Sequence, residues 1–463
     1  MQTNKTTRSD VVRVTELVDG AKLGPFLLSI VFLGFLCQMG DGYDLSAAAF
    51  AAIGITNEWG IDRHLLTPIF TASLVGMLFG ALGFGYIGDR FGRRIAIMAC
   101  TLSCGIFSLL TATADSIGTL VLFRFFTGLA LGGLPANTVA LTAEYAPARM
   151  RAVLITLMFM GLTLGGSLPG QLGSIIPHTQ WRLMFVVGGI APITACILTF
   201  FFMPESMKFL AVRDAKDPRI LKYARKVRPD IAIPDDATFQ ILHLSEKNFR
   251  IGQLFQGKLK IITPLLWAMT ISNLLANFFL NSWMPTLLHS IGLSPHDAES
   301  TASMYYFGGI IGGMAMAFAI DKARLWVVPV YMGLGAPVVI WLGMQNLPLM
   351  LKLGVFLVGV LVLGNQLGLN ALVGLCYPTQ IRANGTGWGL GIGRFGAIAG
   401  PIIGGALIHL HLPMAVLFCV PATSLVCGCI ATSFLAVVAR DRFVRGPAAA
   451  NVDVPEKKVS MSH

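Results

Sequence analysis

Two acidic residues, Asp41 and Asp44, lie inside an otherwise apolar stretch that spans residues 25–52. A carboxylate near the centre of a bilayer costs about 2.5–3.5 kcal/mol on insertion scales, so acids in such places mark ion or substrate pathways. Their i and i+3 spacing puts both on one helical face, where they can face a water-filled cavity and exchange protons. The alternative is that both lie at headgroup level and only cap the helix.

Two arginines in apolar segments are the basic counterparts of these acids. Arg124 lies roughly 10 Å into segment 117–144, a depth that agrees with that of Asp41 within about one helical turn. Pairing them would offset the burial cost of both charges, whereas the alternative is that Arg124 extends outward to lipid phosphates. Arg394 lies near the middle of segment 385–408, which contains no acid. Its guanidinium suits a ligand carboxylate, although a structural contact to backbone carbonyls or to an acid of another helix stays open.

Amide side chains form polar stripes on two further apolar segments. Segment 259–286 carries Asn273, Asn277 and Asn281, and segment 347–375 carries Asn365, Gln366 and Asn370. Amides exposed to lipid are costly, so these stripes are expected to face other helices or a cavity. Contacts between helices alone would account for part of them.

The composition is that of a protein with many membrane-spanning helices. Of the 463 residues, 55% are hydrophobic and 12% are charged, whereas a soluble domain carries about 25% charged residues. The net charge of +11 falls mostly in short segments between apolar runs, which fits the positive-inside rule and argues against a nucleic-acid partner. The eight cysteines form no CxxC pair and the histidines form no HExxH motif. We therefore expect no disulfides and no metal-dependent enzyme.

Twelve membrane-spanning helices are predicted from the apolar runs. They cover 25–52, 65–87, 94–113, 117–144, 152–175, 181–203, 259–286, 297–320, 326–343, 347–375, 385–408 and 413–438. Lys and Arg gather in alternate connections, which predicts that both termini and the middle segment are cytoplasmic. The predicted organisation is a cytoplasmic N-terminal tail (1–22), a six-helix bundle (23–203), a cytoplasmic central loop (204–256), a second six-helix bundle (257–438) and a cytoplasmic C-terminal tail (439–463).

Short motifs repeat between the two halves. Asp89 and Asp321 follow the second and eighth helices at an offset of 232, and Arg151 and Arg382 follow the fourth and tenth at 231. Two matches at nearly one offset indicate an internal duplication. The heaviest polar content falls in the first and fourth helix of each half, which predicts a central cavity built from equivalent helices.

These motifs resemble a known family. The stretch 85–94, with Asp89, Arg90, Gly92, Arg93 and Arg94, resembles the signature loop of the major facilitator superfamily, and Pro204-Glu205-Ser206 is also typical of it. Asp41-Gly-Tyr-Asp44, Arg124, Gly393-Arg394-Phe395-Gly396 and the stretch 279–287 together resemble the bacterial aromatic acid:proton symporters, carriers of compounds such as 4-hydroxybenzoate and gallate. The resemblance covers the whole chain. It implies an all-α membrane protein with twelve transmembrane helices in two pseudo-symmetric six-helix bundles.

The resemblance also implies roles for individual residues in a carrier that imports an aromatic carboxylate by proton symport through alternating access. Asp41 and Asp44 would bind the proton, which serves as coupling ion without any cofactor. The substrate would contact Arg124, Arg394, Tyr43, Asn273, Asn277, Asn281, Gln366, Asn370 and Trp388. Gating at the cytoplasmic ends would involve Asp89, Arg90, Arg93, Glu144 and Arg382. The second copy of the signature loop departs from the pattern at Arg324 and Leu325.

Other functions stay open at this point. One alternative is a proton-coupled carrier of another small organic anion, such as an aliphatic dicarboxylate or a sugar acid. Another is a membrane sensor of aromatic acids. The lack of an appended signalling domain disfavours a sensor. We expect a functional monomer in the bacterial inner (cytoplasmic) membrane, whose partners are the lipid bilayer, protons and an aromatic carboxylate.

Overall fold

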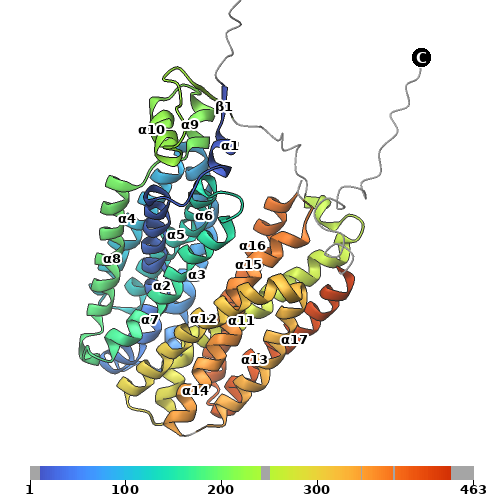
Figure 1. Ribbon diagram of the computed structural model, residues 1–463. Coiled ribbons are helices and arrows are strands. Elements are labelled where there is room, and N and C mark those ends of the chain that lie inside the picture. Colours follow the sequence, from blue (N-terminus) through green and yellow to red (C-terminus); the bar gives the residue numbers. More distant parts are fainter. Residues whose placement is uncertain (1–10, 241–250, 346, 379–380, 440–463) are drawn as a thin grey trace, which may run out of the picture.

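The computed structural model describes residues 11–240, 251–345, 347–378 and 381–439 (Figure 1). Most of this chain is helical, because a backbone in lipid satisfies its own hydrogen bonds within a helix. The first six membrane-spanning segments are α2 (Pro25–Trp59), α3 (Thr67–Phe91), α4 (Arg93–Ala112), α5 with α6 (Ile117–Gly132 and Leu134–Tyr145), α7 (Arg151–Gly173) and α8 (Arg182–Phe202). We call these helices the first half.

The second half repeats this arrangement. It comprises α11 (Leu259–Ser290), α12 (Pro295–Ala323), α13 (Val327–Gly343), α14 with the π-helical η5 and α15 (Pro348–Val358, Gly359–Leu363 and Gly364–Cys376), α16 (Arg382–His409) and α17 (Met414–Val438). In the described part of the chain, eleven segments are long and apolar enough to cross a membrane, and Val327–Gly343 is a shorter apolar helix of 17 residues. A helix of 17 residues is at the short end of the spanning range. The predicted twelve-helix fold is confirmed.

The fourth segment of each half is interrupted. Gly133 separates α5 from α6, and Pro135 follows at the start of α6, where its missing N–H costs little. In the second half, η5 widens the helix between α14 and α15, next to the close approach of Gly359 to the Tyr305 carbonyl oxygen of α12. These interrupted segments are the ones that carry Arg124 and Gln366.

One end of the molecule carries a small folded cap. Strand β1 (Val11–Arg13) pairs in parallel with β2 (Thr238–Gln240), and α1 (Val14–Asp19), α9 (Met207–Arg213) and α10 (Pro218–Val227) pack beside them (Figure 1). Their apolar side chains, among them Val14, Leu210, Ile220 and Phe239, join the core of the first half. In its described residues, the segment that the sequence predicts to be a loop therefore contains two α-helices, a strand and the short helix η3 (Ile251–Phe255). We call this end of the molecule the tail end and the opposite end the far end.

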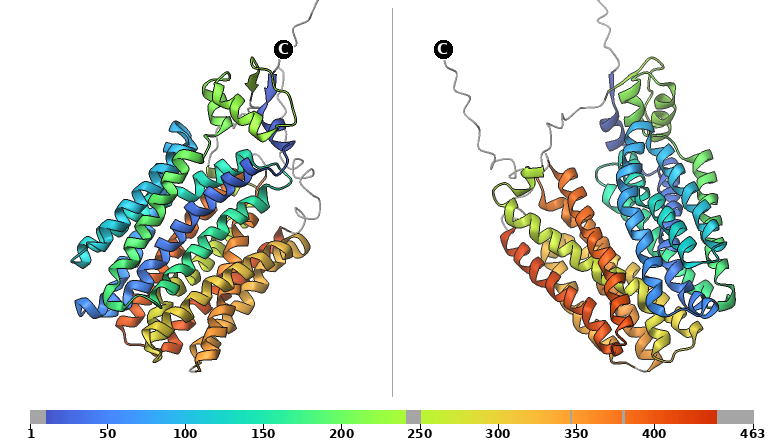
Figure 2. Two further views of the ribbon diagram at one scale, coloured as in Figure 1. Left: turned by 60° about the vertical axis from the view of Figure 1, so that its left-hand side comes forward. Right: turned by 180° about the vertical axis from the view of Figure 1, so that it is seen from behind.

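The two halves are in contact toward the far end and diverge toward the tail end (Figures 1 and 2). The short helices η1 (Arg63–Leu66) and η2 (His178–Gln180) lie at the far end, whereas η3 (Ile251–Phe255) and η4 (Arg324–Trp326) precede α11 and α13. Aromatic contacts join the halves: the Phe70 and Trp283 rings are 5.1 Å apart, and those of His64 and His409 are 4.5 Å apart. The far end is therefore closed in this conformation.

Candidate functional site

The acidic motif of α2 is buried inside the first half. Asp41 is 1% exposed and Asp44 is fully buried. Helix α7 crosses α2 at this level so closely that a Cβ on Gly42 would lie 1.8 Å from the Leu162 carbonyl oxygen. Glycine is therefore required between the two acids, because any side chain there would push α7 away. The motif is rigidly placed by the packing of two helices.

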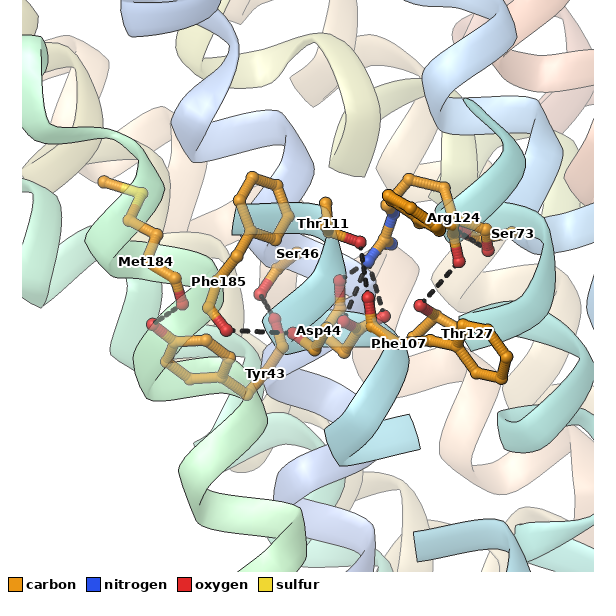
Figure 3. Close-up of polar contacts among 12 residues, drawn as sticks. Tyr43, Asp44, Ser46, Ser73, Phe107, Thr111, Arg124, Thr127, Met184 and Phe185 are labelled. Carbon is orange, nitrogen blue, oxygen red and sulfur yellow. Dashed lines mark hydrogen bonds and ion pairs between the residues drawn. The ribbon is translucent and has the colours of Figure 1, made fainter. Parts of the chain in front are cut away.

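Arg124 of α5 forms an ion pair with Asp44 (Figure 3). Its Nη1 donates to Asp44 Oδ1 at 2.8 Å and Oδ2 at 2.7 Å, and its Nη2 donates to the Asp44 backbone oxygen at 3.0 Å. Both side chains are almost completely buried. The prediction of an acid–arginine pair at matching depth is correct for Arg124, but the acid is Asp44 and not Asp41. The two acids are less than one turn apart, and a depth estimate does not resolve that difference.

Asp41 is left beside this pair without the same compensation. Among the described residues, none donates a hydrogen bond to its Oδ1 atom. Its charge interacts electrostatically with that of Arg394, which comes from α16 in the opposite half. Arg394 is half-buried, and its Nη1 donates to the Met77 carbonyl oxygen of α3. Arg394 thus faces the first half from across the interface.

The polar stripes of α11 and α15 contact one another and α12. Asn273 donates to Gln366 Oε1 at 2.6 Å and accepts from Asn365 at 2.9 Å. The α12 tyrosines bind the other two amides of α11: Tyr305 donates to Asn277 Oδ1 at 2.5 Å, and Tyr306 donates to Asn281. These amides join helices of the second half, as one of the two sequence interpretations stated. A small cavity of about 10 Å³, the volume for one water, is lined by both Arg124 and Asn281 and so lies between the halves.

The remaining predicted substrate contacts are distributed differently. Tyr43 is 2% exposed and donates from its hydroxyl to the Met184 carbonyl oxygen at 2.9 Å, which places it in the packing of α2 against α8 (Figure 3). Trp388 of α16 is 38% exposed. Asn370 lies in α15 and the gating candidate Arg382 in α16, but their side chains lie outside the described part of the structure. The structure therefore does not bring Tyr43 together with Arg394 and the amides.

The signature loop at the tail end contacts other residues of the first half. Arg93 pairs with Asp89 at 2.6 Å, and Arg90 donates to the Tyr86 hydroxyl at 2.6 Å. Glu144 of α6 accepts from the Ser206 hydroxyl and interacts electrostatically with Arg93. The halves diverge at this end (Figure 1), and the gating role of these groups stays a prediction.

Two acids that the sequence interpretation passed over are buried in the structure. Glu205 is 6% exposed, and its Oε1 accepts from the backbone N–H groups of Ser206 at 2.9 Å and Arg94 at 3.2 Å. It thereby caps the start of α4, whose preceding residue Gly92 has φ +111°. The motif Pro204-Glu205-Ser206 was visible in the sequence, but its role was not. Glu299 lies within the predicted eighth helix. It is therefore an acid inside a membrane-spanning segment, the same signal that selected Asp41.

The fold and these buried charges define a class of protein, a membrane transporter built from two six-helix halves. The family model described as Sugar (and other) transporter matches residues 39–328, and the model described as Major Facilitator Superfamily matches residues 266–460. The chain belongs to the major facilitator superfamily. It is a multi-pass membrane protein and a transporter.

Within the superfamily, the chain is related to transporters of aromatic acids. It is 34% identical over 407 residues to the 4-hydroxybenzoate transporter PcaK of Pseudomonas aeruginosa, covering 86% of this chain and 90% of the relative. It is 33% identical over 410 residues to the gallate transporter of Pseudomonas putida, covering 88% and 91%. The xylose transporter XylE from E. coli, in a partially occluded inward open conformation, matches with a TM-score of 0.67 at 15% identity, covering 89% of this chain and 97% of that one. The family and fold expected from the sequence are confirmed.

Proposed function

We propose that this transporter imports an aromatic carboxylate together with a proton across the bacterial inner membrane. Support comes from its relatives, which carry 4-hydroxybenzoate and gallate. Support for the direction comes from the Lys- and Arg-rich connections, because basic loops favour the cytoplasm. With that orientation the tail end faces the cytoplasm, and the divergence of the halves there corresponds to an inward-facing state.

The observation that carries proton coupling is the charge balance of three buried groups, Asp41, Asp44 and Arg124, with the half-buried Arg394. Asp44 and Arg124 neutralise one another. When Asp41 is ionised, its charge balances that of Arg394 from the opposite half. A substrate anion bound to Arg394 would add a negative charge in a region where unpaired charges are costly. A proton on Asp41 removes one negative charge and restores neutrality. Substrate and proton are therefore expected to load together, one proton for each monovalent carboxylate.

The substrate in this proposal lies between Arg394 and the amides of α11 and α15. The guanidinium of Arg394 provides a fork of donors for a carboxylate, and Asn273, Asn277 and Gln366 provide amide groups for ring hydroxyls. Both terminal nitrogens of Arg124 donate to Asp44, which argues against a direct contact of these nitrogens with substrate in this conformation. We assign Asp41 as the proton carrier and the Asp44–Arg124 pair as its charged neighbour.

Uptake into proteoliposomes tests the proposal. One proton per monovalent anion makes transport electroneutral, so a pH difference with an alkaline interior should concentrate labelled 4-hydroxybenzoate about tenfold per pH unit, and an imposed potential should not. Asp41→Asn should abolish this accumulation while exchange of internal for external substrate continues. Asp115→Asn, at a side chain that is 95% exposed, is the matched control and should behave as the wild type.

Two further measurements make the result decisive. Liposomes without protein measure passive entry of the neutral acid, and competition by benzoate, gallate, an aliphatic dicarboxylate and a sugar acid identifies the substrate class. Normal accumulation by Asp41→Asn would remove the proton assignment. If only the aliphatic dicarboxylate or the sugar acid competes, the assignment of an aromatic substrate is wrong. Absence of exchange in the wild type would favour a sensor.

A further inference from the structure

A second buried carboxylate lies far from the acidic motif in sequence. Glu299 belongs to the first part of α12, near the far end, and is fully buried. Among the described residues, none donates a hydrogen bond to either of its carboxylate oxygens. A carboxylate in that environment loses its hydration without replacement, so the neutral acid is strongly favoured over the ion.

The position of Glu299 is the interface between the two halves. Helix α7 of the first half packs directly against it: a Cβ on Gly173 would lie 2.0 Å from Glu299 Oε2. One turn further along α12, the Ser303 hydroxyl accepts from Gln171 of α7 at 2.7 Å. The carboxyl is dry because the halves are in contact here. Separation of α7 from α12 would expose it to water from the far side.

A histidine connects this carboxyl with solvent. The Nδ1 atom of His178, in η2 between α7 and α8, lies 3.3 Å from Glu299 Oε1, and the His178 side chain is 26% exposed. Burial and the neighbouring His289 of α11 and His296 of α12 lower the pKa of His178, so its ring is neutral at pH 7. On α12, the exposed Asp297 lies 3.9 Å from His296. A neutral ring offers one acceptor nitrogen, to which a protonated carboxyl can donate.

We propose that Glu299 is a proton-binding site that controls the opening of the far end, taking up a proton from far-side water when α7 and α12 close and returning it when they separate. The His178 ring passes the proton between the carboxyl and solvent. The proposal rests on the alternating movement of the two halves in the proposed function, but not on coupling through Asp41. The proton enters and leaves on one side, so it is regulatory and adds nothing to the transported charge.

The sign of the effect follows from linkage. Closure of the far end binds a proton, so acid on the far side favours the closed form and alkali favours the open form. Across the range in which the carboxyl titrates, the ratio of closed to open molecules should change up to tenfold per pH unit. An acidic periplasm would therefore help to close the transporter behind its substrate.

The test is the pH dependence of a distance across the far end, measured on the purified full-length protein without substrate. Spin labels replace Asp115 in the first half and Leu347 in the second, side chains that are exposed in the structure, and serine replaces the exposed Cys419 and Cys427. In the wild-type background, the fraction of molecules with the short distance between the labels should increase as pH falls from about 8 to about 5. Glu299→Gln, neutral at every pH, should show the short distance throughout, and Glu299→Leu is a second neutral variant should the first fail to fold.

Controls separate this proposal from the coupling site. Asp297→Asn, at an exposed carboxylate two positions away on α12, should keep the wild-type pH dependence. Asp41→Asn should also keep the wild-type pH dependence of the distance, although this variant is expected to abolish accumulation. A wild-type pH dependence in both Glu299 variants, or a distance that does not respond to pH in the wild type, would overturn the proposal. Loss of the response in Asp41→Asn alone would assign the proton to Asp41 instead.

Discussion

Asp44 and Arg124 stabilise the fold only as a pair. Both are withdrawn from water, and the guanidinium contacts the carboxylate and the backbone of the same residue. Removing one member of a buried pair leaves the other charge uncompensated and costs about 3–5 kcal/mol, whereas replacing both by neutral groups often costs little. The stability and the transport roles of this pair can therefore be separated by mutation.

We expect Asp44→Asn to lower the free energy of unfolding by about 3–5 kcal/mol. The double variant Asp44→Asn/Arg124→Gln should recover most of that loss, because no unpaired charge remains, but should not recover proton-driven accumulation. Thermal unfolding in detergent measures the first effect and proteoliposome uptake the second. A double variant as unstable as the single one would show that the pair contributes through packing, and restored accumulation would remove the pair from coupling.

The sequence was sufficient to select these residues but not to pair them. Acids and arginines in apolar segments are recognisable from hydropathy alone, and depth along a helix brought Arg124 to the level of the acidic motif. The choice between Asp41 and Asp44 depends on helix rotation, which length and composition leave undetermined. Tyr43 illustrates the same limit, because its ring packs against α8 and its hydroxyl binds a backbone oxygen there.

At the scale of elements, Glu205 fixes the connection between α8 and the start of α4. Its carboxylate accepts from two backbone N–H groups, and its own carbonyl oxygen accepts from the Tyr145 hydroxyl at 2.5 Å. A carboxylate at a helix N-terminus also interacts favourably with the helix dipole. Through its carboxylate and its backbone carbonyl, this single residue therefore joins three segments at the tail end.

Glu205→Ala should leave the buried N–H group of Ser206 and the part-buried N–H group of Arg94 without acceptors. Loss of the buried acceptor should destabilise the protein by about 1–3 kcal/mol, and loss of the part-buried one by less. Glu205→Gln keeps an acceptor oxygen and should lose less. Thermal unfolding of both variants is compared with Glu16→Ala, whose exposed ion pair with Arg13 contributes under about 1 kcal/mol. Equal melting temperatures for Glu205→Ala and Glu16→Ala would contradict the capping role.

Element prediction succeeded where long apolar runs decide the structure and failed where they do not. All twelve membrane-spanning segments were located, because only helices satisfy a backbone in lipid. Their ends agree within a few residues except for α2, which continues to Trp59, seven residues beyond its predicted end. The cap of β1, α1, α9, α10 and β2 was missed because its sequence is charged and its core depends on contacts between segments distant in the chain. The π-helical interruption η5 could not be predicted from the hydropathy pattern, since its residues are as apolar as those around it.

At the scale of the whole molecule, closure of the far end is the state that the contacts between halves stabilise. His64 of η1 and His409 of α16 lie in opposite halves with ring centroids 4.5 Å apart. A reducible thiol cross-linker between His64→Cys and His409→Cys should therefore stop uptake, because the far end can no longer open. Reduction of the linker should restore it.

The single-cysteine variants treated with the same reagent are the controls, since the exposed native Cys419 and Cys427 also react. Uptake at the untreated rate by the cross-linked protein would mean that the far end does not separate during transport.

The two-half architecture followed from the repeated motifs at nearly constant offset, but the conformation did not. The inward-facing and outward-facing states of a transporter share one sequence and differ by only a few kcal/mol. No local pattern can therefore indicate which end is closed.

The pairing of β1 with β2 has a consequence for biosynthesis. Val11 emerges from the ribosome among the first residues, but its partner Thr238 is translated more than two hundred residues later. At about 5–20 residues per second, the N-terminal strand waits for ten seconds or longer while six helices enter the membrane. Translation thus reaches the second half just as the first becomes complete, and the order of synthesis separates two similar bundles in time.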